Sequence, residues 1–527
     1  MNISVFLIFV FFCFFFLLLV FSFNLKIGFF FTDWNFLSFK MNLYYNSIVF
    51  SFILLIVTVS VLVFSTYYLD GELNFNYYYF VLLIFVGSMF GLNFSSSVFT
   101  MLVSWDVLGI SSFFLVLFYN NWDSCSGAMN TVLTNRLGDF FLFVFFSLGF
   151  FSSFFFLGLS FFVCMSGLML ILTAFTKSAQ FPFSGWLPKA MSAPTPVSSL
   201  VHSSTLVTAG LILIMNFNEM IMSSSLSSII LVSGIFTMFF SSVTALVEED
   251  MKKVVALSTL SQMGFSMLTI GLGLSFISFV HLVSHALFKS CLFMQVGYMI
   301  HCSFGQQDGR SYSNLGNLPF FIQLQLLVTL FCLCGLIFSS GAVSKDFILE
   351  LFFSNSYMIL FSLMFFFSVF FTFGYSYRLW KSFFLSFSSS VGHYSGGFVM
   401  NFLSLILIVL SVIFLWWMNL NTMFLPSFFL YMDFFAPLMY LFLSFFVLFL
   451  SMKVFMKELV YKFVVDYLPK LSITQMGSYK FLDLFLNNIN SKGFSSFSFS
   501  TFSSNSFMKS SNYNSIIIII MIMMVII

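Results

Sequence analysis

The chain has 527 residues, of which 60% are hydrophobic and 7% are charged, and its formal net charge is +2. Soluble domains carry about 25% charged residues, so this composition excludes a soluble globular protein. The sequence also lacks a basic patch interleaved with aromatic residues, which excludes a nucleic-acid-binding protein.

Long apolar runs define the expected elements. A helix needs about 20 apolar residues to cross a bilayer, and the chain has roughly fifteen such runs. We therefore predict an all-α polytopic membrane protein with about 15 transmembrane helices. The first run lacks the basic region and cleavage site of a signal peptide, so we expect it to remain as a helix. The expected helices are 3–24, 44–66, 76–94, 96–119, 135–157, 160–180, 197–216, 226–247, 252–273, 275–300, 321–354 (interrupted), 356–384, 398–420, 428–452 and 515–527.

Asp106 lies near the middle of the predicted helix 96–119. A charged side chain at mid-bilayer costs a few kcal/mol or more, so it is a functional candidate by default. Its alternative role is a structural ion pair, and we favour proton chemistry. Arg136 and Asp139 stand one helical turn apart and can pair, with structural and functional roles equally open.

An interruption between two apolar runs carries the strongest candidate. Lys177 comes just before the break, and His202 lies in the helix that follows it. Proline ends helices, and a break at membrane depth survives only where it is buried in protein or lines a wet cavity. An opposite charge at about 4 Å is worth roughly 4 kcal/mol at an effective dielectric of about 20, enough to decide whether a buried lysine keeps its proton. Four of the eight prolines fall in this stretch: Pro182, Pro188, Pro194 and Pro196.

His281, His285 and Lys289 form an i, i+4, i+8 stripe on the predicted helix 275–300. Histidine titrates near neutral pH, so the stripe suits a proton relay. Two histidines at i, i+4 can also bind zinc, but no third ligand is evident nearby. The relay is the favoured interpretation.

A second interruption occurs at Ser339, Ser340 and Gly341, just before Lys345 and Asp346. Two broken segments, each with a lysine, are typical of inverted repeats in transporters. The pattern predicts N-terminal helices over 1–75, a first repeat over 76–216, an inverted second repeat over 226–384 and C-terminal helices over 398–452.

The C-terminal region has a different pattern. Lysines and acidic residues recur every four or five positions over 453–470, opposite an apolar face. This pattern predicts an amphipathic helix that lies along the membrane within a lateral segment, 453–514. Residues 491–514 are a Ser/Phe-rich stretch to which we assign no structure, and 515–527 is a short terminal membrane helix.

Loop charges predict the orientation. With the expected helix order, the side that holds the N-terminus and 453–514 has most of the basic loop residues, and the other side has Lys26 and Lys40. The positive-inside rule makes the first side the matrix or interior. Its basic residues are Lys189, Lys252, Lys253, Arg310, Lys381 and the lysines of 453–514.

Seven segments follow one another along the chain: SWDVLGISSFFLV, NRLGDF, TKSAQFPFSGWLPKAMSAPTPVSSLVHSSTLVTAG, EEDMKKVVALSTLSQMG, HLVSHALFKSCLFM, QDGRSYSNLG and the SKD break. Over about 90–380, they resemble in sequence and order a known family: the antiporter-like membrane subunits of mitochondrial NADH–ubiquinone oxidoreductase (complex I). The extension 453–514 favours a longer member of this family over the shorter chains 2 and 4.

The resemblance implies two inverted five-helix repeats whose half-channels are joined by a chain of buried polar residues. It places Asp106 where the family usually has glutamate, and Lys177 and Lys345 in the two broken helices. His202, His281, His285 and Lys289 then form the connecting line. Asp106 is one methylene shorter than glutamate, and the chain has one N-terminal helix fewer than is usual in the family.

The resemblance also implies partners and location: the other membrane subunits of complex I, especially antiporter-like chains 4 and 2 along 453–514, in the mitochondrial inner membrane. The seven cysteines are scattered, and no G-x-G-x-x-G follows a strand, so we expect no cofactor in this chain. NADH, FMN, iron–sulfur clusters and ubiquinone are expected on other subunits. The expected function is redox-driven proton translocation, and the alternatives are a cation/proton antiporter subunit and a structural arm with an inert channel.

Overall fold

The computed structural model describes residues 10–12, 15–16, 27–32, 39–154, 159–221, 224–312, 320–336, 340–341, 344–345, 348–349, 352, 359–384 and 404–412. The expected helices 428–452 and 515–527 and the amphipathic segment 453–514 lie outside these ranges. Most of the expected helices 3–24 and 398–420 also lies outside the described ranges.

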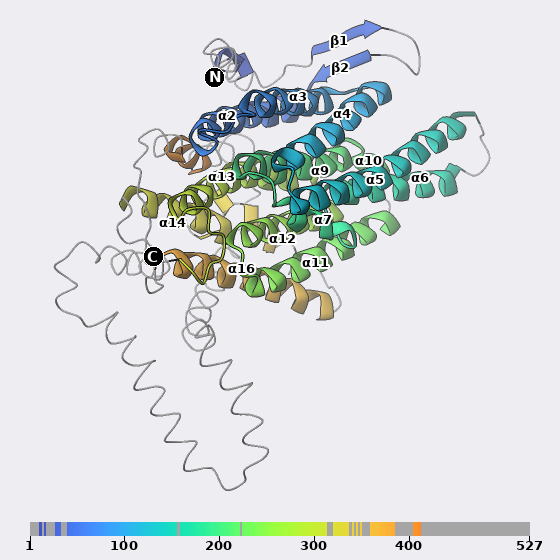
Figure 1. Ribbon diagram of the computed structural model, residues 1–527. Coiled ribbons are helices and arrows are strands. Elements are labelled where there is room, and N and C mark those ends of the chain that lie inside the picture. The colour runs from blue at the N-terminus through green and yellow to red at the C-terminus, as the bar shows by residue number, and fades with distance from the viewer. Residues whose placement is uncertain are drawn as a thin grey trace, which may run out of the picture.

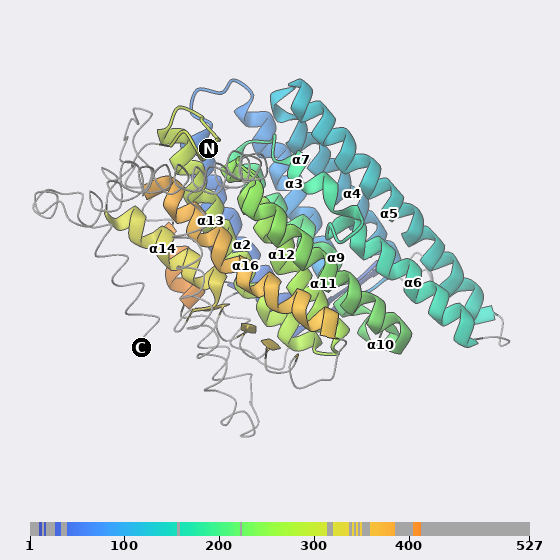
Figure 2. The same ribbon diagram turned by 90° about the horizontal axis from the view of Figure 1, so that it is seen from below.

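The described part is a bundle of helices with nearly parallel long axes (Figures 1 and 2). Within the described ranges, nine helices are long and apolar enough to cross a membrane, and two shorter apolar helices, Met165–Lys177 and Ile322–Cys334, accompany them. The prediction of a polytopic all-α membrane protein is confirmed.

The helices follow the expected order with small shifts at their ends. They are α2 (Tyr45–Tyr68), α3 (Phe75–Phe94), α4 (Val98–Val116), η2 (Leu117–Tyr119), α5 (Trp122–Phe154), α6 (Leu159–Lys177), η3 (Phe183–Gly185), α7 (Trp186–Ala190), α8 (Thr195–Val197), η4 (Ser198–Thr205), α9 (Leu206–Asn216), α10 (Asn218–Ile221), α11 (Ser224–Val247), α12 (Met251–Gly271), α13 (Ser275–Cys302), α14 (Phe320–Cys334) and α16 (Ile359–Phe384).

The helix expected over 135–157 begins earlier, at Trp122, so its predicted start was wrong. The backbone N–H of Asn121 donates to the hydroxyl of Ser124, and Asp123 lies in the first turn, where a negative charge is favourable. These interactions start a helix in a polar stretch that hydropathy alone excludes.

Serine and threonine are compatible with the apolar helices because their hydroxyls donate to carbonyls one turn earlier. In α2, Ser51 donates to Ile48, and Ser65 donates to Leu62. These bonds satisfy the hydroxyl groups, for which the bilayer core offers no hydrogen-bond partner.

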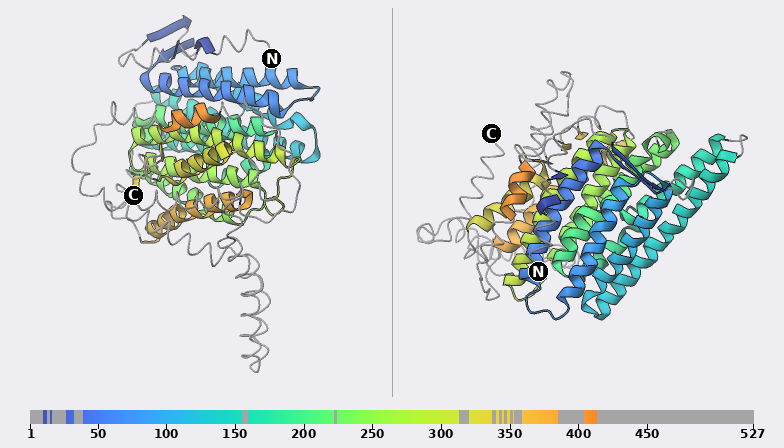
Figure 3. Two further views of the ribbon diagram at one scale, coloured as in Figure 1. Left: turned by 90° about the vertical axis from the view of Figure 1, so that its left-hand side faces the viewer. Right: turned by 90° about the horizontal axis from the view of Figure 1, so that it is seen from above.

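The one described sheet is a hairpin that the sequence pattern did not predict. Strands β1 (Ile27–Thr32) and β2 (Phe39–Leu43) pair antiparallel, with an irregularity between Phe30 and Thr32. A bridge between Met41 and Ser95 joins the hairpin to the end of α3. Figures 1 and 3 show the hairpin at the edge of the bundle, where β2 packs against α3 and α4.

The helices differ in how deeply they are buried. The central windows of α12 and α13 are 94% buried, and the span Thr195–Asn216 is 100% buried, against 33% for the span in α5. Seen from below, α5 and α6 lie at one edge of the bundle, and α14 and α16 lie at the opposite edge (Figure 2). His202, His281, His285 and Lys289 therefore lie on the most enclosed helices, whereas Arg136 and Asp139 lie on α5, the least enclosed of these spans.

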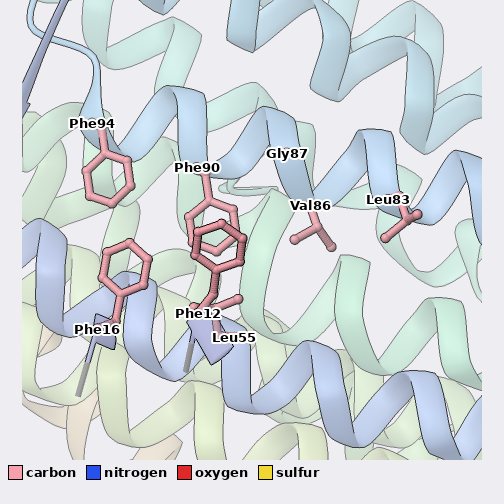
Figure 4. Close-up of a pocket in the computed structure, with 8 residues that line it drawn as sticks. All are labelled: Phe12, Phe16, Leu55, Leu83, Val86, Gly87, Phe90 and Phe94. Carbon is pink, nitrogen blue, oxygen red and sulfur yellow. The ribbon is translucent and has the colours of Figure 1, made fainter. Parts of the chain in front are cut away.

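A cavity of about 370 Å³ lies between α2, α3 and the N-terminal residues (Figure 4). Only apolar residues line it, and the ring of Phe16 stacks against those of Phe90 and Phe94. It holds none of the candidate site residues. The residues that line it are Phe12, Phe16, Leu55, Leu83, Val86, Gly87, Phe90 and Phe94.

Candidate functional site

The first interruption separates α6 from α9 with a series of short helical pieces. Pro182 and Pro194 directly precede η3 and α8, and Pro188 and Pro196 lie in the first turns of α7 and α8, where a backbone N–H has no intrahelical partner. The chain then continues as the π-helical segment η4, a form that is rare and often found at functional sites. Lys177 ends α6, and His202 lies in η4, so the interruption separates the two titratable side chains.

The Lys177 side chain is fully buried and contacts α4. Its ammonium donates to the backbone carbonyl of Trp105 at 2.7 Å and lies 3.9 Å from the centre of the Trp105 ring. Within the described ranges, no carboxylate forms an ion pair with Lys177, although Asp139 and Asp106 are near enough to act on it electrostatically. The Lys177 ammonium is therefore stabilised by the dipole of the Trp105 carbonyl and by the face of the Trp105 ring.

Trp105 links Lys177 to a carboxylate. Its indole N–H donates to Asp139 Oδ1 at 3.0 Å, and Asp139 Oδ2 pairs with Arg136 at 3.1 Å. The expected pairing of Arg136 with Asp139 is thus confirmed. Arg136 also pairs with Asp106 at 3.6 Å.

Asp106 lies further out than Lys177. The side chains of Asp106 and Arg136 are 38% and 52% exposed, whereas that of Lys177 is 0% exposed. Successive helical residues point about 100° apart, so Trp105 faces inward and Asp106 faces outward. Asp106 and Lys177 are therefore connected through Trp105, Asp139 and Arg136.

His202 lies deep in the bundle, with its ring 6.0 Å from the Trp186 ring. Neither ring nitrogen has a hydrogen-bond partner in the described part of the chain. Buried polar atoms are normally satisfied, so two such nitrogens on one side chain are unusual. Both ring nitrogens therefore remain open to a hydrogen bond that the described residues do not supply.

The stripe on α13 is buried along its whole length. His281 Nδ1 lies 2.9 Å from the hydroxyl of Ser344, and the Lys289 ammonium donates to the hydroxyl of Ser258 on α12 at 2.5 Å. His285 lies between them, and neither of its ring nitrogens has a hydrogen-bond partner among the described residues. Three titratable groups thus line one helix face in the interior.

The second interruption places Lys345 close to the stripe. Its side chain is 3% exposed, and its ammonium donates to the backbone carbonyl of Leu333 near the end of α14. Gly335 follows with φ +78°, and an added Cβ there would lie 2.9 Å from the Lys345 side chain. Ser344, the partner of His281, directly precedes Lys345, so the break and the stripe are in contact. Asp346 lies outside the described residues.

Two residues were missed by the sequence analysis. Trp105 carries no charge, and only its position beside Asp106 could have suggested it. Lys252 begins the expected helix 252–273, which α12 confirms, but it was also counted among the charges of the loops: its side chain is 3% exposed, and its ammonium donates to the backbone carbonyl of Ala193. Its neighbour Lys253 is 41% exposed.

The helices that carry the candidate residues pack against one another across the bundle. From one edge to the other they include α5 and α6, then α9, then α13 and α14 (Figure 2). Within the described ranges, no three side chains of metal-binding type come together. The arrangement consists of titratable groups, hydroxyls and main-chain carbonyls, which suits the movement of protons.

Comparisons with known proteins agree with this geometry. Residues 95–372 match the family described as NADH:quinone oxidoreductase/Mrp antiporter, transmembrane. The chain is 72% identical to "NADH-ubiquinone oxidoreductase chain 5" of Caenorhabditis elegans over 497 residues, covering 94% of each chain. It is 69% identical to the protein of that name from Ascaris suum, covering 99% of this chain and 96% of the other.

Two solved structures share the fold. A chain of the Mrp complex from Dietzia sp. superposes with a TM-score of 0.71 at 23% identity, covering 89% of this chain and 56% of that one. A chain of an archaeal membrane-bound sulfane sulfur reductase superposes with a TM-score of 0.67 at 19% identity, covering 76% of this chain and 70% of that one.

Proposed function

Because the chain belongs to the NADH:quinone oxidoreductase/Mrp antiporter family of membrane subunits, we propose that it is a proton-translocating membrane subunit of respiratory NADH:ubiquinone oxidoreductase (complex I). The observation that carries this function is the buried line from Lys177 through His202, His281 and Lys289 to Lys345. Ionisable residues inside a membrane are costly and mark ion paths.

The line moves protons by exchanging charged states between neighbouring groups. Each proton that crosses the membrane costs about 2.3 kcal/mol per 100 mV. A charged pair at about 4 Å is worth roughly 4 kcal/mol at an effective dielectric of about 20. Making or breaking one such interaction between buried groups is therefore comparable in energy to one proton step.

The redox reaction takes place elsewhere in the complex. We expect NADH, FMN, iron–sulfur clusters and ubiquinone on other subunits, and the role of this chain is to convert their energy into proton movement. It is thus an enzyme subunit whose own residues hold and pass protons.

The neighbours in the proposal are the antiporter-like chains 4 and 2. The exposed pair Asp106–Arg136 supports a protein neighbour against α4 and α5, because a charged pair facing lipid would be costly. The location is the mitochondrial inner membrane, with the N-terminus and 453–514 on the matrix side in the proposed orientation.

Replacing Lys177 with methionine tests the function. In inner-membrane vesicles, we expect Lys177→Met to abolish proton translocation or the coupled NADH oxidation, because Met cannot carry a proton. Lys189→Met, at an exposed position of the same interruption, is the matched control. An unchanged number of protons per electron in Lys177→Met would contradict the proposal.

A second candidate is a sodium or potassium/proton antiporter subunit, favoured by the family description and by the fold shared with the Mrp chain. Measuring proton movement in sodium- and potassium-free medium distinguishes the two. Translocation that persists there and requires NADH supports the complex I function, whereas translocation that requires the cation but not NADH supports the antiporter.

A further inference from the structure

Lys252 and Lys253 are adjacent but occupy opposite environments in the first turn of α12. The Lys253 ammonium pairs with Asp250 at 2.5 Å and with Glu248 at 3.9 Å near the surface. The Lys252 side chain is buried. A positive charge is unfavourable at the N-terminus of a helix, and burial adds to the cost. Helix stability therefore does not explain Lys252.

The ammonium of Lys252 contacts the first interruption. It donates to the backbone carbonyl of Ala193, which lies between α7 and α8. The next residue is Pro194, whose nitrogen cannot donate a hydrogen bond. Helix α12 also packs against α7 and η4. The hydrogen bond from Lys252 thus joins α12 to the turn that leads through α8 into η4.

Lys252 also acts on His202. The two side chains are near enough for their charges to interact. His202 lies in η4, which follows the turn that Lys252 contacts by way of the short helix α8.

We propose that Lys252 is a positioning residue for proton transfer through His202. Its ammonium fixes the Ala193 carbonyl, and thereby the turn that leads through α8 into η4. The inference rests on the proposed function of the chain.

The experiment compares four variants in the intact complex: Lys252→Met, Lys252→Arg, Lys253→Met and Lys177→Met. Proton translocation and NADH oxidation are measured in inner-membrane vesicles and divided by the amount of assembled complex. We expect Lys252→Met to lower translocation per assembled complex roughly tenfold, because a hydrogen bond from a charged donor is lost. Lys252→Arg keeps the charge and the donor and should restore most of it, and Lys253→Met should match the wild type.

The outcomes separate the two proposals. Normal translocation per assembled complex in Lys252→Met, with or without a lower amount of complex, would overturn the positioning role. Equal defects in Lys252→Met and Lys252→Arg would also overturn it, as would equal defects in Lys252→Met and Lys253→Met. If Lys177→Met translocates normally, the proposed function itself fails, whereas a defect in Lys177→Met alone removes only the role of Lys252.

Discussion

Trp105 is the residue that makes the outer charges and the buried lysine into one unit. Its carbonyl accepts from Lys177, its ring lies beneath the ammonium, and its indole N–H donates to Asp139. A hydrogen bond to a charged group contributes about 1.5–3 kcal/mol. A side chain without charge therefore sets the electrostatics of the first lysine.

The variant Trp105→Phe isolates the indole N–H, since the carbonyl and an aromatic face remain. We expect proton translocation to fall roughly tenfold or more, because Asp139 loses a donor to its charged form. Trp122→Phe, at a 93% exposed position, is the control. Equal proton yields in the two variants would show that the hydrogen bond has no role.

At the scale of elements, the position of Lys177 depends on how closely α5 and α6 pack against each other. In α5, Gly138 faces Thr176 on α6, and a methyl group at this position would overlap the Thr176 hydroxyl. The residue beside Thr176 is Lys177, so the packing of α5 on α6 sets the position of the ammonium. Small residues allow this approach between membrane helices.

Gly138→Ala tests this packing. Alanine stabilises an isolated helix by roughly 0.5–1 kcal/mol relative to glycine, but overpacking costs about 1–3 kcal/mol. We expect the complex to inactivate at a lower temperature and to translocate fewer protons. Gly109→Ala in α4 has open space around the added methyl group and should be neutral or stabilising. The same thermal stability in both variants would argue against a close contact.

At the scale of the whole molecule, the edge of the bundle formed by α4 and α5 exposes both apolar side chains and an ion pair. Leu133, Leu137 and Phe140 are exposed on α5, on the same helix as the half-exposed Arg136. The opposite edge, at α16, exposes Leu363 and Phe367. Because only the α4–α5 edge carries an exposed ion pair within a described membrane span, it is the one that requires a protein neighbour.

Cysteine cross-linking tests this arrangement. Leu137 is 51% exposed and Leu363 is 50% exposed, so Leu137→Cys and Leu363→Cys are matched by exposure. With a short bifunctional reagent, we expect Leu137→Cys to link to an adjacent membrane subunit of the complex. Failure to link at Leu137 in assembled complex, together with linkage at Leu363, would place the neighbour on the other edge.

The sequence by itself determined the membrane class, the order of the helices, the two interruptions and most of the titratable residues. These features follow from local rules: an apolar run long enough to span, prolines that end helices, and charges that are too costly to be incidental. The same rules failed for the start of α5, where polar capping outweighs hydropathy, and for the hairpin β1–β2.

Only the tertiary structure decided which groups touch. It joined Lys177 to Asp139 through Trp105, turned Asp106 outward, and buried Lys252 while leaving Lys253 exposed. Neighbouring residues on a helix point in different directions, and which direction faces protein depends on helices far away in the chain. The local sequence holds no information on that choice, because the choice depends on how the whole bundle packs.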